Sequence, residues 1–306
     1  MNIQLFTAGI KKELWEFHKI LLWLPIIIGA MAVALPLLQY FTLEEYQWNG
    51  ILRFLGELSS ESLTEYHIEQ IAESSFAAIA GLFIPFIGIS LIVQLYYFTS
   101  CLFDERRDLS VYFWRSLPVS DAATIGTKLL TGGLVIPVIF MVVASITLVA
   151  WIIIALVISV MLASSYSISL WEIWGHVTVL SSLAKIWINL LPYFLWMLPL
   201  YTWFMLASMF ARKAPFLWAV VPVAALAIMD GIFMEFYNLN SFFILPVLGG
   251  YFTISDHAIA NHYSQIKDVT MLPFHVLVDK ISIFGVVAAA TMLYLTYWLR
   301  VNRSEK

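Results

Sequence analysis

Ionisable residues inside long apolar runs are the first candidates for chemistry in this sequence. Asp230 interrupts an apolar segment that runs from Ala214 to about Phe236, and Glu235 follows near its end. A charged side chain at membrane depth is costly, so such residues commonly serve a transport pathway. A position near the outer end of a short, tilted helix, within reach of headgroup water, explains Asp230 as well. Asp230 and Glu235 are therefore the candidate pathway residues.

A second candidate region mixes charged and aromatic residues over positions 103–121, which read FDERRDLSVYFWRSLPVSD. Acidic residues precede basic ones at helical spacing, and an aromatic cluster follows. Pro118 ends a helix because it lacks a backbone N–H, and Ser120 is a typical N-cap for the next helix. The pattern predicts a short amphipathic helix that a soluble partner can contact; a loop that only sets topology is the alternative. The candidate residues are Asp104, Glu105, Arg106, Arg107, Tyr112, Phe113, Trp114, Arg115 and Pro118.

Other chemistry-bearing residues give weaker signals. Five glutamates from Glu57 to Glu73 recur at intervals of four, which suits a solvated helix face or a stripe that binds a cation. His257 and His262 do not have the spacing of a metal pair on a helix. No H-E-x-x-H, G-x-S-x-G, G-x-G-x-x-G or G-x-x-x-x-G-K-[ST] motif occurs. We therefore expect no catalytic site, metal or cofactor, and any ATP is expected on another chain.

The composition defines the class of protein that must position these residues. Of the 306 residues, 61% are hydrophobic and only 12% are charged, against about 25% charged in soluble domains. So few charges cannot cover a water-facing surface, which excludes a soluble enzyme. The net charge of −4 gives no footprint for nucleic acid. The chain is predicted to be an integral membrane protein in contact with the lipid bilayer.

Charge-free runs predict six transmembrane helices, because about 20 apolar residues cross the hydrocarbon core. The longest run, residues 129–171, is interpreted as one span, with 163–167 as its interfacial exit. The predicted fold is an all-α polytopic membrane protein. Its spans lie at about 20–41, 77–101, 133–162, 186–210, 215–236 and 279–299, with outer loops at 42–76, 163–185 and 237–278.

The distribution of Lys and Arg predicts the orientation. With six spans and a cytoplasmic N-terminus, twelve of these residues lie inside and four outside; dividing the long run into two spans gives ten against six. Both termini are therefore expected in the cytoplasm. Residues 1–19 have apolar side chains at helical spacing, which predicts an amphipathic interfacial helix that serves as an anchor or a docking element.

Residues 103–130 resemble the permease subunits of type-2 ABC exporters. The likeness rests on an acidic–basic group, a patch that contains Phe113, a "slPvs" turn and a lysine that enters the third span. In this chain these are Asp104-Glu105-Arg106-Arg107, Ser110, Phe113, Ser116-Leu117-Pro118-Val119-Ser120 and Thr127-Lys128-Leu129-Leu130. The predicted topology extends the resemblance to the whole chain.

The resemblance implies a single transmembrane domain, 1–306, that pairs with a second permease copy or a homologous permease. Two cytoplasmic ABC ATPase subunits would bind ATP and push on residues 103–128, the coupling loop. The N-terminal helix and residues 211–215 would be lesser contacts, and residues 241–251 a re-entrant outer hairpin. The expected location is the bacterial inner membrane. The alternative hypothesis is an ion-coupled secondary transporter that uses Asp230; a membrane-embedded enzyme is disfavoured because no catalytic constellation is apparent.

Overall fold

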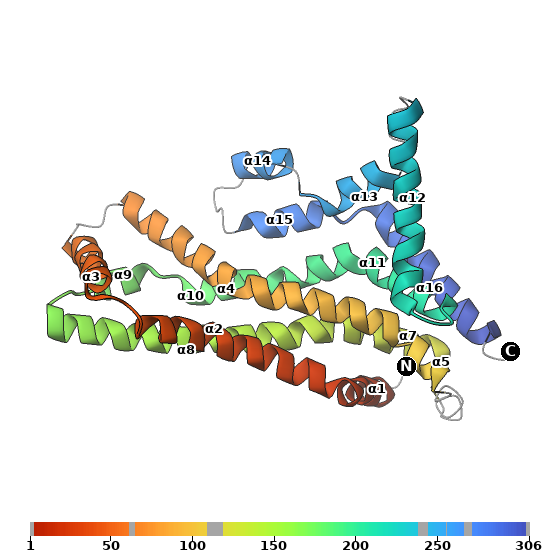
Figure 1. The fold of residues 1–306 in the computed structure, drawn as a ribbon, viewed down its shortest axis with the longest axis horizontal. Helices are drawn as coiled ribbons and strands as arrows, with labels where there is room; N and C mark the ends of the chain where they lie inside the picture. Colours follow the sequence, from red (N-terminus) through yellow and green to blue (C-terminus); the bar gives the residue numbers. More distant parts are fainter. Residues whose placement is uncertain are drawn as a thin grey trace. The chain divides into compact units, whose positions relative to one another are not determined.

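The computed structural model describes residues 3–60, 65–108, 119–237, 244–254, 256–265 and 271–303. Over these ranges the chain is helical with no strand, which confirms the prediction of an all-α protein. The helices are α1 (Ile3–Glu16), α2 (Leu24–Tyr40), α3 (Glu45–Ser60), α4 (Glu65–Ser100), α5 (Phe103–Arg107), α7 (Asp121–Leu130), α8 (Ile136–Tyr166), α9 (Trp171–His176), α10 (Val179–Ile188), α11 (Leu190–Phe210), α12 (Pro215–Tyr237), α13 (Ile244–Phe252), α14 (Asp256–Gln265), α15 (Leu272–Asp279) and α16 (Ile283–Arg303). Two short π-helical turns, η1 (Lys19–Trp23) and η2 (Thr131–Val135), precede α2 and α8. Figure 1 shows the course of the chain.

Within the described residues, six helical stretches are long and apolar enough to cross a membrane, the number predicted from the sequence. Most of the long apolar run lies in one of them, which ends at Tyr166; the next residue, Ser167, has a φ of 59°. Much of the region expected as the outer loop 163–185 is helical, because α8 continues to Tyr166 and α9 and α10 follow. The six stretches are Lys19–Tyr40, His67–Arg107, Asp121–Tyr166, Trp171–Phe210, Pro215–Phe236 and Ile283–Asn302.

The chain divides into two compact units. Unit 1 consists of Met1–Phe17, Ser90–Pro137 and Ile188–Lys306, and unit 2 consists of His18–Ile89 and Val138–Trp187. Each unit is discontinuous in sequence, so the chain passes between the two four times. Of the candidate residues, the described ones from Asp104 to Arg107 and Asp230 belong to unit 1.

Helix α11 forms the centre of unit 1. It packs against α16, α12, α15 and η2, and its side chains Tyr201 and Met205 are fully buried. The glycines of η2 allow the helices to approach closely, because a Cβ on Gly133 would lie 2.3 Å from Phe194 of α11. At the start of α11, Trp196 and Tyr251 of α13 exchange two hydrogen bonds, each from a side chain to the other residue's backbone carbonyl.

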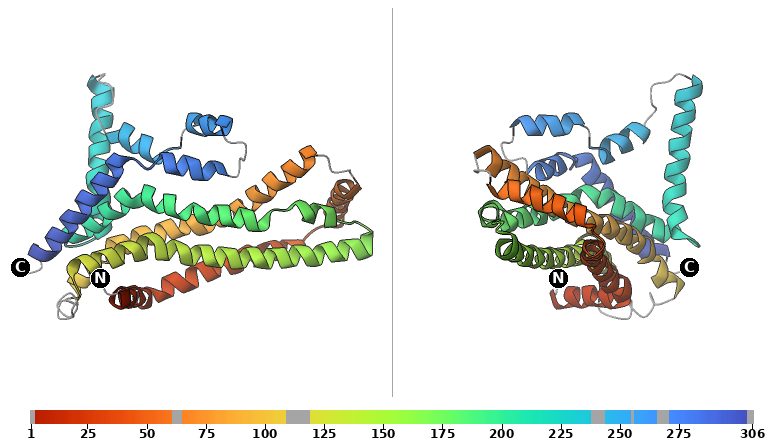
Figure 2. Two further views of the ribbon diagram at one scale, coloured as in Figure 1. Left: turned by 180° about the vertical axis from the view of Figure 1, so that it is seen from behind. Right: turned by 60° about the vertical axis from the view of Figure 1, so that its left-hand side comes forward.

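In unit 2, the long helix α8 contacts α2, α9 and α10. Two indole N–H groups donate hydrogen bonds to serine hydroxyls of α8, Trp187 to Ser145 at 3.3 Å and Trp174 to Ser159 at 3.0 Å. Helix α2 approaches α8 at Gly29, where a Cβ would lie 2.7 Å from the Thr147 hydroxyl oxygen. The two helices run side by side in Figures 1 and 2. Indole and hydroxyl groups thus satisfy each other without charge along this helix.

Candidate functional site: a buried ionic cluster

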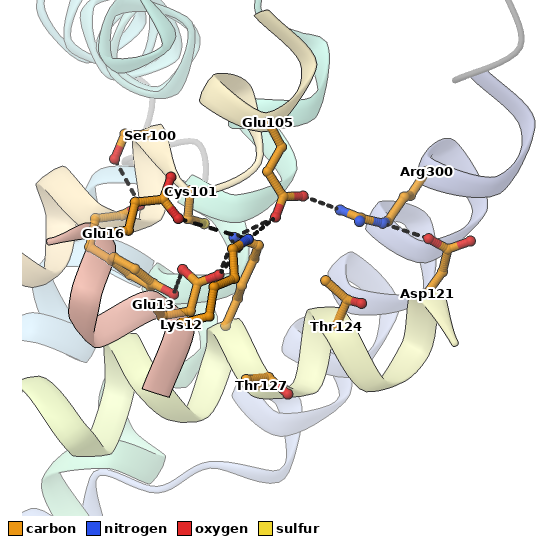
Figure 3. A network of polar contacts seen from close by, with 12 residues as sticks. Lys12, Glu13, Glu16, Ser100, Cys101, Glu105, Asp121, Thr124, Thr127 and Arg300 are labelled. Carbon is orange, nitrogen blue, oxygen red and sulfur yellow. Dashed lines mark hydrogen bonds and ion pairs between the residues drawn. The ribbon is translucent and has the colours of Figure 1, made fainter. Parts of the chain in front are cut away.

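Six charged side chains from four helices of unit 1 meet in one buried network, which we call the ionic cluster (Figure 3). Three are cationic and three are acidic, and the more exposed Glu16 of α1 joins them through Lys12 at 3.8 Å. The cluster consists of Lys12 and Glu13 of α1, Glu105 of α5, Asp121 and Lys128 of α7, and Arg300 of α16.

Local sequence explains how α7 presents two of these residues. The Ser120 side chain accepts a hydrogen bond from the Ala123 N–H at 3.2 Å, which caps the helix at its N-terminus as predicted. Asp121 and Lys128 are about two turns apart and therefore lie on the same face of the helix. That face contacts both α1 and α16.

Lys128 joins the acidic residues of α1 and α5. Its ammonium group, on a side chain only 1% exposed, lies 2.8 Å from Glu13 Oε1 and 3.1 Å from Glu105 Oε1. Lys12 also contacts Glu105, at 3.2 Å. The Tyr97 hydroxyl donates a hydrogen bond of 2.8 Å to the other oxygen of Glu13. Both carboxylates thus have charged or hydrogen-bonded partners, as burial of a charge requires.

Arg300 completes the cluster from the last helix of the chain. Its Nη1 donates to Glu105 Oε2 at 3.0 Å and its Nε donates to Asp121 Oδ1 at 2.7 Å. The rigid guanidinium fork therefore joins α5 to α7, the two elements that flank residues 109–118. A lysine at position 300 would offer a single ammonium group in place of this fork.

Arg106 attaches α5 to the end of α11. Its guanidinium donates hydrogen bonds to the backbone carbonyl oxygens of Ser208 and of Ala211, the latter at 3.0 Å. Carbonyls in the last turn of a helix have no partner within the helix, and a cation there also interacts favourably with the helix dipole. Adjacent residues Glu105 and Arg106 thus bind α16 and α11.

The predicted coupling residues divide into buried and surface groups. Glu105 and Arg106 are engaged inside unit 1, whereas Arg107 and Asp108 are exposed and paired with each other at 2.9 Å. Asp104 pairs with Arg107 at 3.1 Å. The remaining predicted residues, Tyr112, Phe113, Trp114, Arg115 and Pro118, lie outside the described residues.

Sequence reasoning missed most of the ionic cluster. Lys12 and Glu13 lie within residues 1–19, for which the sequence predicts only an interfacial helix, and Arg300 is only one of the twelve basic residues expected inside. In the structure Glu13 is 3% exposed, whereas the neighbouring Trp15 is 74% exposed. Lys12 and Glu13 of α1 therefore face the protein, whereas Lys11 and Glu16 are exposed. Their opposite-charge partners were visible in the sequence, but residues separated by 115 positions, as Glu13 and Lys128 are, cannot be paired by spacing alone.

A second polar site surrounds Gln94 of α4, which is fully buried. Its amide nitrogen donates to the carbonyl oxygens of Gly132 at 3.0 Å and Gly133 at 3.4 Å, within η2. Its amide oxygen accepts hydrogen bonds from the hydroxyls of Tyr193 and Tyr201, both at 3.1 Å. Gln94 could not be found by looking for charged residues in apolar runs, because glutamine is uncharged.

The two candidate pathway residues are separated by the structure. Asp230 is 5% exposed, whereas Glu235 is on the exposed surface of α12. Five residues along a helix correspond to a rotation of roughly 140°, so the two side chains point to different sides. Only Asp230 has the buried environment expected of a functional acid at membrane depth.

Two histidines of α14 and α15 form a small cluster of their own. His262 of α14 lies 2.6 Å from a carboxylate oxygen of Asp279, and its ring stacks on His275 of α15. No group of three or more His, Cys, Asp or Glu residues in the described ranges is arranged to hold a metal ion.

No protein-family model, curated protein or solved structure matches this chain. The ionic cluster and the Gln94 site are therefore interpreted from their own geometry.

Proposed function

We propose that this chain is the membrane-spanning permease subunit of an ATP-driven exporter, coupled through residues 103–128 to a separate ATPase subunit. The observation that carries the proposal is the ionic cluster. It joins α5 and α7, the two flanks of the proposed coupling loop, to the first helix and the last span of the chain.

Such a cluster suits the transmission of force. Opening one of its ion pairs leaves an unpaired buried charge, which costs about 3–5 kcal/mol. The helices α1, α5, α7 and α16 therefore resist moving apart, and the contact of Arg106 with the end of α11 adds a fifth element. A push on the loop would be distributed over these helices instead of bending one of them.

The remaining parts of the assembly follow from the same proposal. The chain would bind no nucleotide itself; ATP would be bound by two ABC ATPase subunits on the cytoplasmic side. A second permease copy or a homologous permease would complete the translocation path. The expected location is the bacterial inner membrane, with both termini in the cytoplasm.

The test is purification of the tagged chain, in mild detergent, from cells that express its neighbouring genes. We expect a stoichiometric partner subunit with vanadate-sensitive ATPase activity. A combined replacement of Arg107, Asp108 and Trp114 by Ala should weaken partner binding or abolish stimulated ATPase activity. Arg107 and Asp108 are exposed, so the ionic cluster stays intact in this variant.

A matched control replaces Arg53 and Glu57 by Ala, an exposed basic–acidic pair on α3 of unit 2. The control should keep both the partner and its activity. Isolation of the chain without any ATPase, or a loop variant as active as the control, would contradict the proposal.

The second candidate function is an ion-coupled secondary transporter, and the burial of Asp230 in α12 favours it. It requires pH-dependent transport in vesicles without nucleotide. Asp230→Asn should then abolish uptake, whereas Glu235→Gln on the same helix should leave it unchanged. Transport that needs ATP and survives Asp230→Asn would exclude this alternative.

A further inference from the structure

The chain crosses between the two compact units at four points, and each lies close to an irregularity in a helix. The crossing at residues 17/18 adjoins the π-helical turn η1, and that at 137/138 follows η2. The crossing at 89/90 lies one turn after Pro85 within α4, and that at 187/188 lies in the last residues of α10, just before its break from α11.

A helix bends most readily at such irregularities, because fewer regular backbone hydrogen bonds must be broken there. A π-helical turn inserts an extra residue into the i→i−4 hydrogen-bond ladder, and a proline removes one of its donors. Kinks in helices concentrate at such positions. Each of the four crossings between the units therefore lies near a point where the chain bends readily.

Gln94 stabilises the joint in the third span. Its side chain comes from α4 and binds two carbonyl oxygens within η2, while Tyr193 and Tyr201 fix the orientation of its amide group. The carbonyl groups of a π-helical turn are therefore held by a side chain of another helix. All of these residues belong to unit 1.

Two buried hydroxyl groups beside this joint lack partners. Ser90, one turn before Gln94 on α4, and Thr131, the first residue of η2, are at most 1% exposed. Neither hydroxyl oxygen has a hydrogen-bond partner among the described residues. A buried polar group without a partner is unfavourable and rare, so an arrangement of the joint that supplies partners would compete with this one.

We propose that the boundary between the units is a hinge, and that Gln94 is the positioning residue that holds its third-span joint in one arrangement. The use of the hinge in transport rests on the proposed function, whereas the hinge itself does not. Loss of the Gln94 amide should free η2 and give the two units a second relative arrangement.

The experiment measures a distance between the units in the chain alone, reconstituted in lipid nanodiscs. Spin labels are attached at Glu172→Cys in unit 2 and Arg212→Cys in unit 1, both exposed, with Cys101→Ala to remove the native thiol. Gln94→Met keeps the length and the burial of the side chain but removes its hydrogen bonds. We expect a second or shifted population in the distance distribution of this variant.

Tyr201→Phe is the matched control. It removes a buried hydrogen bond to Gln94 but leaves the two bonds to η2, so its distance distribution should equal that of the parent chain. A Gln94→Met distribution identical to the parent, or an equal change in Tyr201→Phe, would overturn the proposal.

A second measurement needs no variant at Gln94 and covers the case in which that variant does not fold. Hydrogen exchange of the parent chain should be faster at residues 131–135 than in the centre of α8. Equal protection of the two regions would show that η2 is no joint. Neither measurement involves an ATPase. A negative result would therefore overturn the hinge but not the permease proposal, which is tested by co-purification of the ATPase subunit.

Discussion

Lys128 forms ion pairs with two acidic residues, so replacing it by a neutral residue removes a partner from both. Its ammonium group is shared by Glu13 and Glu105, and no water-exposed surface is available to any of the three. The interior therefore tolerates this lysine because of its partners, and tolerates the carboxylates because of the lysine.

Lys128→Met should lower the free energy of unfolding by about 3–5 kcal/mol, because both carboxylates lose a buried partner. Thermal unfolding in detergent measures this loss. Lys11→Met, an exposed lysine on α1, is the control and should change stability little. Equal unfolding temperatures for the two variants would show that the cluster is not formed in the membrane protein.

Adding Glu13→Gln to Lys128→Met should restore part of the lost stability. The double variant removes one acidic and one basic group, so fewer uncompensated charges remain. The free energies of unfolding of the two single variants and the double variant form a cycle that gives the coupling between the residues. Strictly additive effects would contradict the observed contact of 2.8 Å.

The pKa of Glu16 is raised above its ordinary value of 4.5 by partial burial and by the neighbouring carboxylate of Glu13. The folded protein thus binds this proton more tightly than the unfolded chain does. The contribution of Glu16 to the free energy of unfolding is therefore most favourable at low pH and is lost as the pH rises above the ordinary pKa of 4.5. Glu16→Gln should therefore stabilise the protein more near neutral pH than near pH 4.5, as the unfolding temperature at each pH would show. A difference independent of pH would argue against the shift.

At the scale of elements, the π-helical turn η2 lets three helices approach each other. A Cβ on Gly132 would lie 2.4 Å from the ring of Phe98, and one on Gly133 would lie 2.3 Å from Phe194. Because aromatic rings in a packed interior cannot move away freely, only glycine fits at these two positions.

Gly132→Ala should destabilise the protein by about 1–3 kcal/mol through this overlap. Gly126 on α7 provides the matched control, since nothing lies within 4 Å of a Cβ at that position. Gly126→Ala should instead stabilise the helix by about 0.5–1 kcal/mol, because alanine loses less backbone freedom on folding. Chemical unfolding of the two variants gives both signs in one comparison; two changes of the same sign would contradict the packing described here.

Elements whose signal is local were predictable from the sequence. The six apolar stretches follow from hydropathy, and the cap at Ser120 follows from a hydroxyl residue placed after Pro118. The π-helical turn η2 was not predictable, because its residues Thr131–Val135 also fit an ordinary helix and its carbonyl partner, Gln94, comes from another span. The ionic cluster was missed for the same reason: each charge has a local explanation, and only tertiary packing selects its partner.

For the whole molecule, the orientation in the membrane remains a prediction with a direct test. Cys101 is buried and should not react with a membrane-impermeant maleimide, so single cysteines can be introduced into the chain. Glu172→Cys should be labelled in intact cells, and Arg212→Cys only in inside-out vesicles. The reverse result would favour two spans in the long apolar run, because a seventh span inverts every later segment.

The ionic cluster also bears on how the protein is made. Glu13 precedes Arg300 by most of the sequence and therefore leaves the ribosome well before it. Glu105 and Asp121 are therefore synthesised before the guanidinium group that contacts them both. A chain released before its last span would therefore enter the membrane with carboxylates that lack this partner. The contact between Arg300 and its two acids thus forms only after α16 has been synthesised, so folding of this region is completed late.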